Sequence, residues 1–307
     1  RISMNKTATL LLASLLSGCA SQIPAQQPVD ASALAQQHSP VEMDAQTADK
    51  LKALLKIQPP RGSTDIGQMN DLISREFLHT PYAANRLHGS ATLAEKLVVD
   101  FRGLDCFTYL DYVEALRQSS DEAGFINNLV QIRYVNGDIN FLNRRHFFTD
   151  WAHAGQPMAE DVTAQLSANA VTVAKRLNQK ADGGRYLPGL PVAERDITYI
   201  PSALIDQHLL SHLRTGDYIG IYTHLSGLDV THTGLFIQTA QGPVLRNASS
   251  KKDQGAVIDS PFMEYVHNVP GIVVLRARQD SQAGQDASAA KAGTQALQHQ
   301  ARSPAQG

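Results

Sequence analysis

Two hydrophobic periodicities follow one another along the chain, and their order constrains the fold more than any other feature. Apolar residues first recur at intervals of three and four, the spacing of one helix face, and later gather in short runs between turn residues. Helices are expected over residues 43–57, 65–77, 106–116, 121–132 and 202–213, and strands over 162–177, 217–222, 231–238, 243–246 and 271–275. Gln241-Gly242 fits a hairpin turn, and residues 183–200 are expected to form a loop. Helices followed by a mainly antiparallel sheet predict an α+β fold.

The composition is ordinary for a globular protein. Of the 307 residues, 43% are hydrophobic and 18% are charged, and the formal net charge is −2. This balance gives no electrostatic reason to expect a nucleic-acid partner. Both ends of the chain lack the apolar periodicity of a folded domain. We therefore expect a flexible tether over residues 20–42, a catalytic domain over 43–276 and a disordered tail over 277–307.

The N-terminal segment has the form of a signal peptide. A short positive region and a short apolar run follow Met4, and the run is too short to span a bilayer. It ends in Leu-Ser-Gly before Cys19, which resembles a bacterial lipobox. The resemblance implies that residues 1–19 are a lipoprotein signal peptide with its lipobox, and that Cys19 is lipidated. Ala20 in place of Asp implies an outer-membrane anchor on the periplasmic side. The alternative is a plain secretory peptide with an incidental cysteine.

The other cysteine, Cys106, follows Asp105 at the start of a predicted helix. The Asp105 carboxylate can cap the helix by accepting from free backbone N–H groups. The helix dipole and the unpaired N–H groups of a first turn favour a thiolate over a thiol. If lipid takes Cys19, Cys106 is an unpaired thiol in an oxidising compartment. Such a cysteine is either a small buried apolar residue or a group kept for chemistry.

A cysteine nucleophile needs a base, and the base needs a group that orients it. Among 11 histidines, His232 stands at the start of a predicted strand, which can hold its ring toward the cysteine. Gly234 leaves room beside it. The next strand ends near Asn247, whose amide oxygen can accept from the imidazole. The alternatives are a half-buried strand histidine and a turn asparagine at a strand end.

These motifs occur in an order known from one protein superfamily. In chain order they are Pro-Tyr at Tyr82, Asp-Cys at Cys106, Gly-Asp at Asp217, His-Thr-Gly-Leu-Phe-Ile from His232 and Asn-Ala-Ser from Asn247. Together they resemble the NlpC-type papain-like cell-wall hydrolases. The runs Tyr-Val-Asn-Gly and Arg-Arg-His-Phe-Phe-Thr-Asp-Trp resemble the AmiA-like branch, named for N-acetylmuramoyl-L-alanine amidase activity. Phe-Thr follows the cysteine where the wider superfamily has Ser-Gly, and this departure fits the branch.

The resemblance implies a papain-like α+β core and a cysteine amidase that cuts peptidoglycan or its muropeptide fragments. The bond implied is the one between the muramic acid lactyl group and L-Ala, cut through a thioester. Cys106 would be the nucleophile, His232 the acid and base, and Asn247 the group that orients His232. The backbone N–H of Cys106 would stabilise the oxyanion, with the Tyr82 hydroxyl as a further donor.

Four more side chains are candidates for substrate contact. Asp105 would meet a substrate amine, unless it is only a cap. Arg145, His146 and Trp151 lie in an aromatic and basic run that suits a carboxylate and a sugar face. The alternative for this run is a helix with its aromatic residues in the core.

Two other functions remain open from the sequence. One is an endopeptidase that cuts between D-Glu and diaminopimelate in the stem peptide, and the other is a lipid-anchored peptidoglycan-binding module whose triad is inactive. No Cys/His cluster has metal-ligand spacing, so no metal or other cofactor is expected. The chain is expected to be a monomer whose only partners are its peptidoglycan substrate and the membrane.

Overall fold

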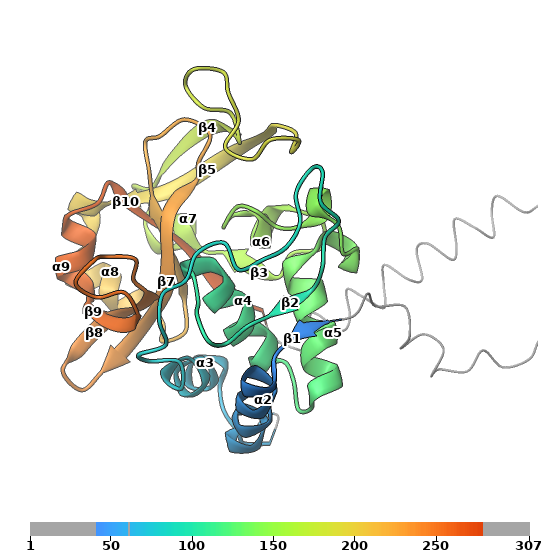
Figure 1. Cartoon of the computed structure of the whole chain (residues 1–307). Helices are drawn as coiled ribbons and strands as arrows, with labels where there is room; N and C mark the ends of the chain where they lie inside the picture. Colours follow the sequence, from blue (N-terminus) through green and yellow to red (C-terminus); the bar gives the residue numbers. More distant parts are fainter. Residues whose placement is uncertain (1–40, 61, 279–307) are drawn as a thin grey trace, which may run out of the picture. The chain divides into compact units, whose positions relative to one another are not determined.

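An antiparallel sheet organises the computed structural model, which describes residues 41–60 and 62–278 (Figure 1). Within these residues the sheet has eight strands, in the order β4-β5-β10-β6-β7-β8-β9, with β3 paired to β10. Every pairing in this sheet is antiparallel, and a separate parallel pair joins β1 to β2. The expected α+β fold with a mainly antiparallel sheet is confirmed.

The elements are bounded as follows. The strands are β1 (Glu42–Met43), β2 (Val98–Val99), β3 (Ala159–Asp161), β4 (Val171–Leu177), β5 (Ala193–Pro201), β6 (Tyr218–Tyr222), β7 (Val230–Thr239), β8 (Gly242–Ala248), β9 (Val257–Pro261) and β10 (Gly271–Ala277). The α-helices are α2 (Ala45–Ile57), α3 (Ile66–Arg75), α4 (Cys106–Arg117), α5 (Glu122–Arg133), α6 (Asp150–His153), α7 (Thr163–Leu166), α8 (Gln207–His212) and α9 (Phe262–His267). Short 3₁₀ helices cover Val135–Gly137, Phe141–Asn143 and Ser202–Leu204.

Several predicted segments fall outside this description. The expected signal peptide with Cys19 lies outside the described residues, as do nearly all of the expected tether and tail. Within residues 41–60 and 62–278, no helix has the length and apolar character needed to cross a membrane.

Aspartate caps fix where the longer helices begin. The residue before each of α2, α3, α4, α5 and α8 is an aspartate whose carboxylate accepts from a backbone N–H of the first turn. Each cap satisfies one or two of the N–H groups that a helix start leaves without an intrahelical partner. The starts of α2, α3, α4 and α5 therefore lie within two residues of those expected from the sequence, whereas α8 begins five residues later than expected.

Helix α4 is the centre of the core on one side of the sheet. It packs against α3, α5 and β7, and every residue from Thr108 to Arg117 is buried. Strand β6 alternates between the two sides, since Tyr218 and Tyr222 belong to the core around α4. Ile219 and Ile221 belong to a second core with α8 and α9. Figure 1 shows α4 on one side of β7 and α8 and α9 on the other.

Three predicted segments differ from the structure. The helix expected over residues 202–213 divides into the 3₁₀ helix Ser202–Leu204 and α8. Residues 183–200, expected to be a loop, contain the first eight residues of β5, which pairs with β4 over residues 193–199 and with β10 at its end. Residues 162–177, expected to be one strand, divide into α7 and β4. Strand β9 and helix α9 were not predicted. The expected hairpin turn at Gln241 is present between β7 and β8.

Candidate active site

The start of α4 presents Cys106 beside a complete N-terminal cap. Asp105 Oδ1 accepts from the backbone N–H groups of Phe107 (2.9 Å) and Thr108 (2.8 Å). In return, the Asp105 N–H donates to the Thr108 hydroxyl (3.2 Å), which completes a capping box. Asp105 is therefore the cap that the sequence predicts. The backbone N–H of Cys106 takes no part in these cap bonds.

The Cys106 thiol is free and partly buried. Its burial and the neighbouring Asp105 carboxylate raise the pKa of the thiol to about 11, although a hydrogen bond from Thr233 acts in the opposite direction. The sequence led us to expect a thiolate at the helix start. With this pKa the thiol is protonated at neutral pH, because the cost of burying a thiolate outweighs the stabilising effect of the helix start.

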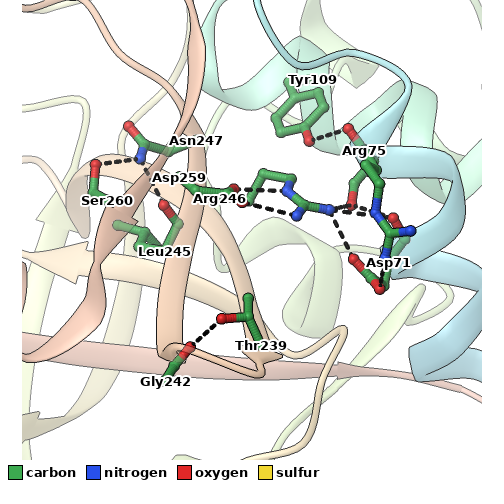
Figure 2. Close-up of polar contacts among 11 residues, drawn as sticks. Asp71, Arg75, Tyr109, Thr239, Gly242, Leu245, Arg246, Asn247, Asp259 and Ser260 are labelled. Atoms are coloured by element: carbon green, nitrogen blue, oxygen red, sulfur yellow. Dashed lines mark hydrogen bonds and ion pairs between the residues drawn. The ribbon is translucent and has the colours of Figure 1, made fainter.

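His232, near the start of β7, pairs with Asn247 near the end of β8. The ring Nε2 of His232 lies 2.9 Å from Asn247 Oδ1. Figure 2 shows how the Asn247 amide is held: its Nδ2 donates to the Leu245 carbonyl (2.9 Å) and to the Ser260 hydroxyl (3.2 Å). Because both amide donors are used, Oδ1 accepts from His232, and Nε2 carries the hydrogen. Nδ1 is then the ring nitrogen that can accept a proton.

Burial lowers the pKa of His232 below its ordinary value of 6.5, and the bond to Asn247 only partly offsets this. The nearby Lys251 charge lowers it further. His232 is therefore neutral at pH 7, which leaves its Nδ1 lone pair available to a proton donor.

Strand β7 meets α4 through Thr233, the residue after His232. The Thr233 hydroxyl donates to the carbonyl oxygen of Cys106 (2.7 Å). Gly234 allows β8 to approach, since a Cβ there would lie 2.8 Å from the Arg246 carbonyl oxygen and 3.0 Å from Asn247 Cβ. In the described part of the chain, Cys106 and His232 make no hydrogen bond to each other. Catalytic hydrogen bonds are often long without substrate and tighten when it binds.

Two tyrosines flank the thiol from different segments. The backbone N–H of Tyr82 donates to the Gly255 carbonyl (2.8 Å), and Tyr82 bridges to Leu104, just before the cap. The Tyr265 ring, in α9, lies 6.1 Å from the His232 ring and only 21° from parallel. Burial raises the pKa of both phenols, and the charge of a Cys106 thiolate would raise each further. Cys106 therefore lies within electrostatic reach of both rings.

The sequence singled out Tyr82 but not Tyr265. Helix α9 has only six residues and follows a strand that ends in proline, so the local pattern gave no element there. No motif identified Tyr265. Its place beside His232 depends on how β9 and α9 fold back along β8.

The guanidinium of Arg145 is bonded to the protein itself. It donates to five backbone carbonyls between 2.7 and 3.1 Å away, and Arg145 is only 4% exposed. These carbonyls belong to residues 131, 132, 134, 154 and 156. Arg145 therefore ties the end of α5 to the turn after α6, and the structure gives it no role toward a substrate carboxylate.

Trp151 lies inside the fold, and His146 is half-buried beside the 3₁₀ helix Phe141–Asn143. Trp151 is fully buried and packs on Tyr218 and Phe107, with ring centroids 4.9 and 5.9 Å apart. His146 Nε2 lies 2.7 Å from the Phe141 carbonyl oxygen, and burial lowers its pKa to about 4. The alternative for this run, with aromatic residues in the core, describes Trp151 correctly, because its fully buried ring cannot contact a sugar.

A buried arginine beside Asn247 was not predicted. Arg246 donates to both carboxylate oxygens of Asp259 (2.7 and 2.9 Å), and also to Asp71 Oδ1 (2.8 Å) and Ser74 Oγ (3.1 Å). Figure 2 shows this cluster joining β8 to β9 and to α3. Because Arg246 precedes Asn247, these bonds fix the backbone that carries the partner of His232.

Within residues 41–60 and 62–278, no group of three or more His, Cys, Asp or Glu side chains has an arrangement that could hold a metal ion.

Comparison with known proteins identifies relatives of this chain. A family model described as AmiA-like, N-acetylmuramoyl-L-alanine amidase-like, matches residues 72–272. A crystal structure of an N-acetylmuramoyl-L-alanine amidase from Bacteroides uniformis is 27% identical, covers 69% of this chain and 99% of its own, and gives a TM-score of 0.59. No curated protein matches the chain significantly.

Two further solved structures share the fold. A Legionella pneumophila protein is 22% identical and covers 76% of this chain and 95% of its own, with a TM-score of 0.63. A putative xylanase from Bacteroides fragilis is 26% identical and covers 66% and 98%, with a TM-score of 0.55. The same arrangement of helices and strands therefore recurs in several bacterial proteins.

Proposed function

Because the chain belongs to the AmiA-like, N-acetylmuramoyl-L-alanine amidase-like family, we propose that it hydrolyses an amide bond of peptidoglycan or of its soluble fragments, with Cys106 as the nucleophile. The observation that carries this proposal is the 2.9 Å pairing of His232 Nε2 with Asn247 Oδ1, on a strand that contacts the Cys106 backbone. A thiol, an imidazole and an amide in this relation suit a papain-like mechanism.

In the first half of the reaction, His232 Nδ1 takes the thiol proton as Cys106 Sγ attacks the carbonyl carbon of the amide. The carbonyl oxygen becomes an oxyanion. The backbone N–H of Cys106, which the Asp105 cap leaves unused, can donate to it, and the Tyr82 hydroxyl is a second candidate donor. His232 then gives its proton to the leaving amine, and the C–N bond breaks to leave a thioester.

In the second half, water replaces the amine. His232 Nδ1 takes a proton from the water as its oxygen attacks the thioester carbonyl. The C–S bond breaks, and the proton returns to the sulfur. The products are a carboxylic acid and a free amine, and Cys106 and His232 are both neutral again. Asn247 holds the ring through Nε2 in both halves.

The amide bond that we propose joins the muramic acid lactyl group to L-Ala. The test is mass spectrometry of muropeptides, including anhydro-muropeptides, incubated with the full chain and its variants. We expect free stem peptide and free saccharide from the wild type, none from Cys106→Ala, and wild-type yields from Cys19→Ala, which removes the other cysteine. Full activity in a folded Cys106→Ala variant would overturn the cysteine mechanism.

The same spectra separate the alternatives. Fragments that end in L-Ala-D-Glu would replace this proposal with an endopeptidase. Cleaved sugar chains would point to a glycosidase, and binding without any product to a peptidoglycan-binding module.

We further propose that the chain acts at the periplasmic face of the outer membrane, as a monomer anchored through lipid on Cys19. Cells fed labelled palmitate should label the wild type and not Cys19→Ala. Labelling of both, or of neither, would contradict the anchor.

A further inference from the structure

A cavity of about 450 Å³ lies between the loop after β8, strand β9 and helix α9. Charged and aromatic side chains line it, among them Lys251, Asp259, Glu264 and Tyr265. In Figure 1, α9 lies next to β8 and β9, at the edge of the sheet. The volume is in the range of small-molecule sites, about 300–1,000 Å³.

The cavity shares a wall with the candidate active site. One face of the Tyr265 ring is stacked near the His232 ring, and the Lys251 ammonium lies 5.1 Å from the Tyr265 ring centroid. Tyr265 also lies within electrostatic reach of Cys106. A molecule in the cavity would therefore lie beside the residue that protonates the leaving amine in the proposed reaction.

Two side chains of opposite charge, Lys251 and Glu264, are exposed at the wall of this cavity. Asp259 is paired with Arg246 through both carboxylate oxygens. Within the described residues, neither Lys251 nor Glu264 forms a salt bridge. The cavity therefore offers one cation and one anion to a ligand, and this charge pattern complements a group that carries both a carboxylate and an ammonium.

We infer that this cavity binds the leaving peptide through a zwitterionic amino-acid end, with its carboxylate on Lys251 and its ammonium toward Glu264. The inference rests on the proposed function, because His232 gives its proton to the leaving amine and the peptide must depart on that side. Tyr265 separates the reacting centre from the charged subsite. A charged subsite of this kind selects peptides that carry both groups, such as those with a free diamino-acid end.

The experiment compares three substrates with the wild type and three variants. The substrates are a muramyl peptide with a free diamino-acid end, the same peptide with that carboxyl amidated, and the same peptide with that amine acetylated. We expect amidation to lower kcat/KM of the wild type by about tenfold, as for one charge-assisted hydrogen bond. In Lys251→Gln, kcat/KM for the free peptide should fall by about the same factor, and amidating the substrate should lower it little further. In Glu264→Gln, kcat/KM for the free peptide should fall in the same way, and acetylating the substrate amine should lower it little further.

Lys252→Gln is the matched control, since it removes the adjacent cation, which does not line the cavity. It should behave as the wild type does. The inference is overturned if Lys251→Gln and Lys252→Gln lower kcat/KM for the free peptide equally. It is also overturned if amidation of the substrate lowers kcat/KM of the wild type and of Lys251→Gln by the same factor.

A binding measurement separates this inference from the proposed function. Calorimetry with the free peptide and the Cys106→Ala variant needs no turnover, and adding Lys251→Gln should weaken binding by about tenfold. If the wild type releases peptide but Lys251→Gln binds it unchanged, the subsite is wrong and the function stands. If no muropeptide is cut but Lys251 still controls peptide binding, the function is wrong and the subsite stands.

Discussion

Burial shifts the pKa values of Cys106 and His232 in opposite directions. It raises the pKa of the Cys106 thiol to about 11 and lowers the pKa of His232 below 6.5. Both groups are therefore neutral near pH 7, and under the proposed mechanism proton transfer accompanies the attack by sulfur. Local sequence patterns singled out Cys106, His232 and Asn247. They could not predict the pKa shifts, because these depend on burial by segments distant in sequence.

The pH profile tests the His232–Asn247 pair. Activity should fall as pH drops through the His232 pKa, because a protonated imidazole cannot accept the thiol proton, so the acid limb of the wild type lies below pH 6.5. In Asn247→Asp, a carboxylate beside Nε2 raises the pKa of His232 and moves this limb to higher pH. The measurement is kcat/KM from pH 4 to 9.

Asn169→Asp, the same change at an exposed position, should leave the acid limb in place. Thermal unfolding shows whether Asn247→Asp is folded, since Asn247 also donates to Leu245 and Ser260. An unmoved acid limb in a folded Asn247→Asp protein would mean that Asn247 does not partner His232 in solution.

Among the elements, most helices with an aspartate cap and an apolar face were predicted well, and two strands of the sheet, β5 and β9, were not. The first half of β5, Ala-Glu-Arg-Asp, is charged, and only its second half shows the alternation of a strand. Strand β9 has five residues and ends in Pro261. Both strands exist because a neighbouring strand pairs with them, and such non-local pairing leaves little trace in local sequence.

At the start of α4, the effect of the Asp105 charge can be tested separately from its capping hydrogen bonds. Asp105→Asn keeps an acceptor for the N–H groups of Phe107 and Thr108 but removes a charge that raises the Cys106 pKa. The thiol pKa should therefore fall, and alkylation of Cys106 by iodoacetamide at pH 8 should be several-fold faster. Asp105→Ala also loses the cap, at about 1 kcal/mol of stability.

Asp121→Asn provides the matched control, because Asp121 caps α5 in the same way. Its alkylation rate should equal that of the wild type. Equal rates in Asp105→Asn and the wild type would show that the Asp105 charge does not act on the thiol.

Across the whole molecule, one buried arginine joins the layer of helices to the sheet edge that carries the site. Arg246 is 3% exposed and binds Asp71 of α3 and Asp259 of β9 from its place in β8. Its carboxylate partners come from segments far apart in the sequence. No local motif distinguishes such an arginine from a solvated one, so this connection could be found only in the folded structure.

Removing Arg246 should destabilise the fold. Arg246→Ala leaves Asp259 without a cation and Asp71 with only the exposed Arg75, and it should reduce stability by on the order of 3 kcal/mol, or roughly 6–12 °C in Tm. Arg75→Ala is the control, because Arg75 pairs with the same Asp71 but is 54% exposed, and its loss should stay within about 1 kcal/mol. Calorimetry measures both. Equal losses would contradict the role given to Arg246.

The hydrogen bond between Thr233 and Cys106 joins residues 127 positions apart. As the chain leaves the ribosome, the helix that begins at Cys106 is therefore complete long before the strand that carries His232. Asn247 emerges later still. Under the proposed mechanism, a product of premature termination between these points carries a thiol that nothing can activate. Under that mechanism, the order of translation keeps unfinished copies of the chain inactive.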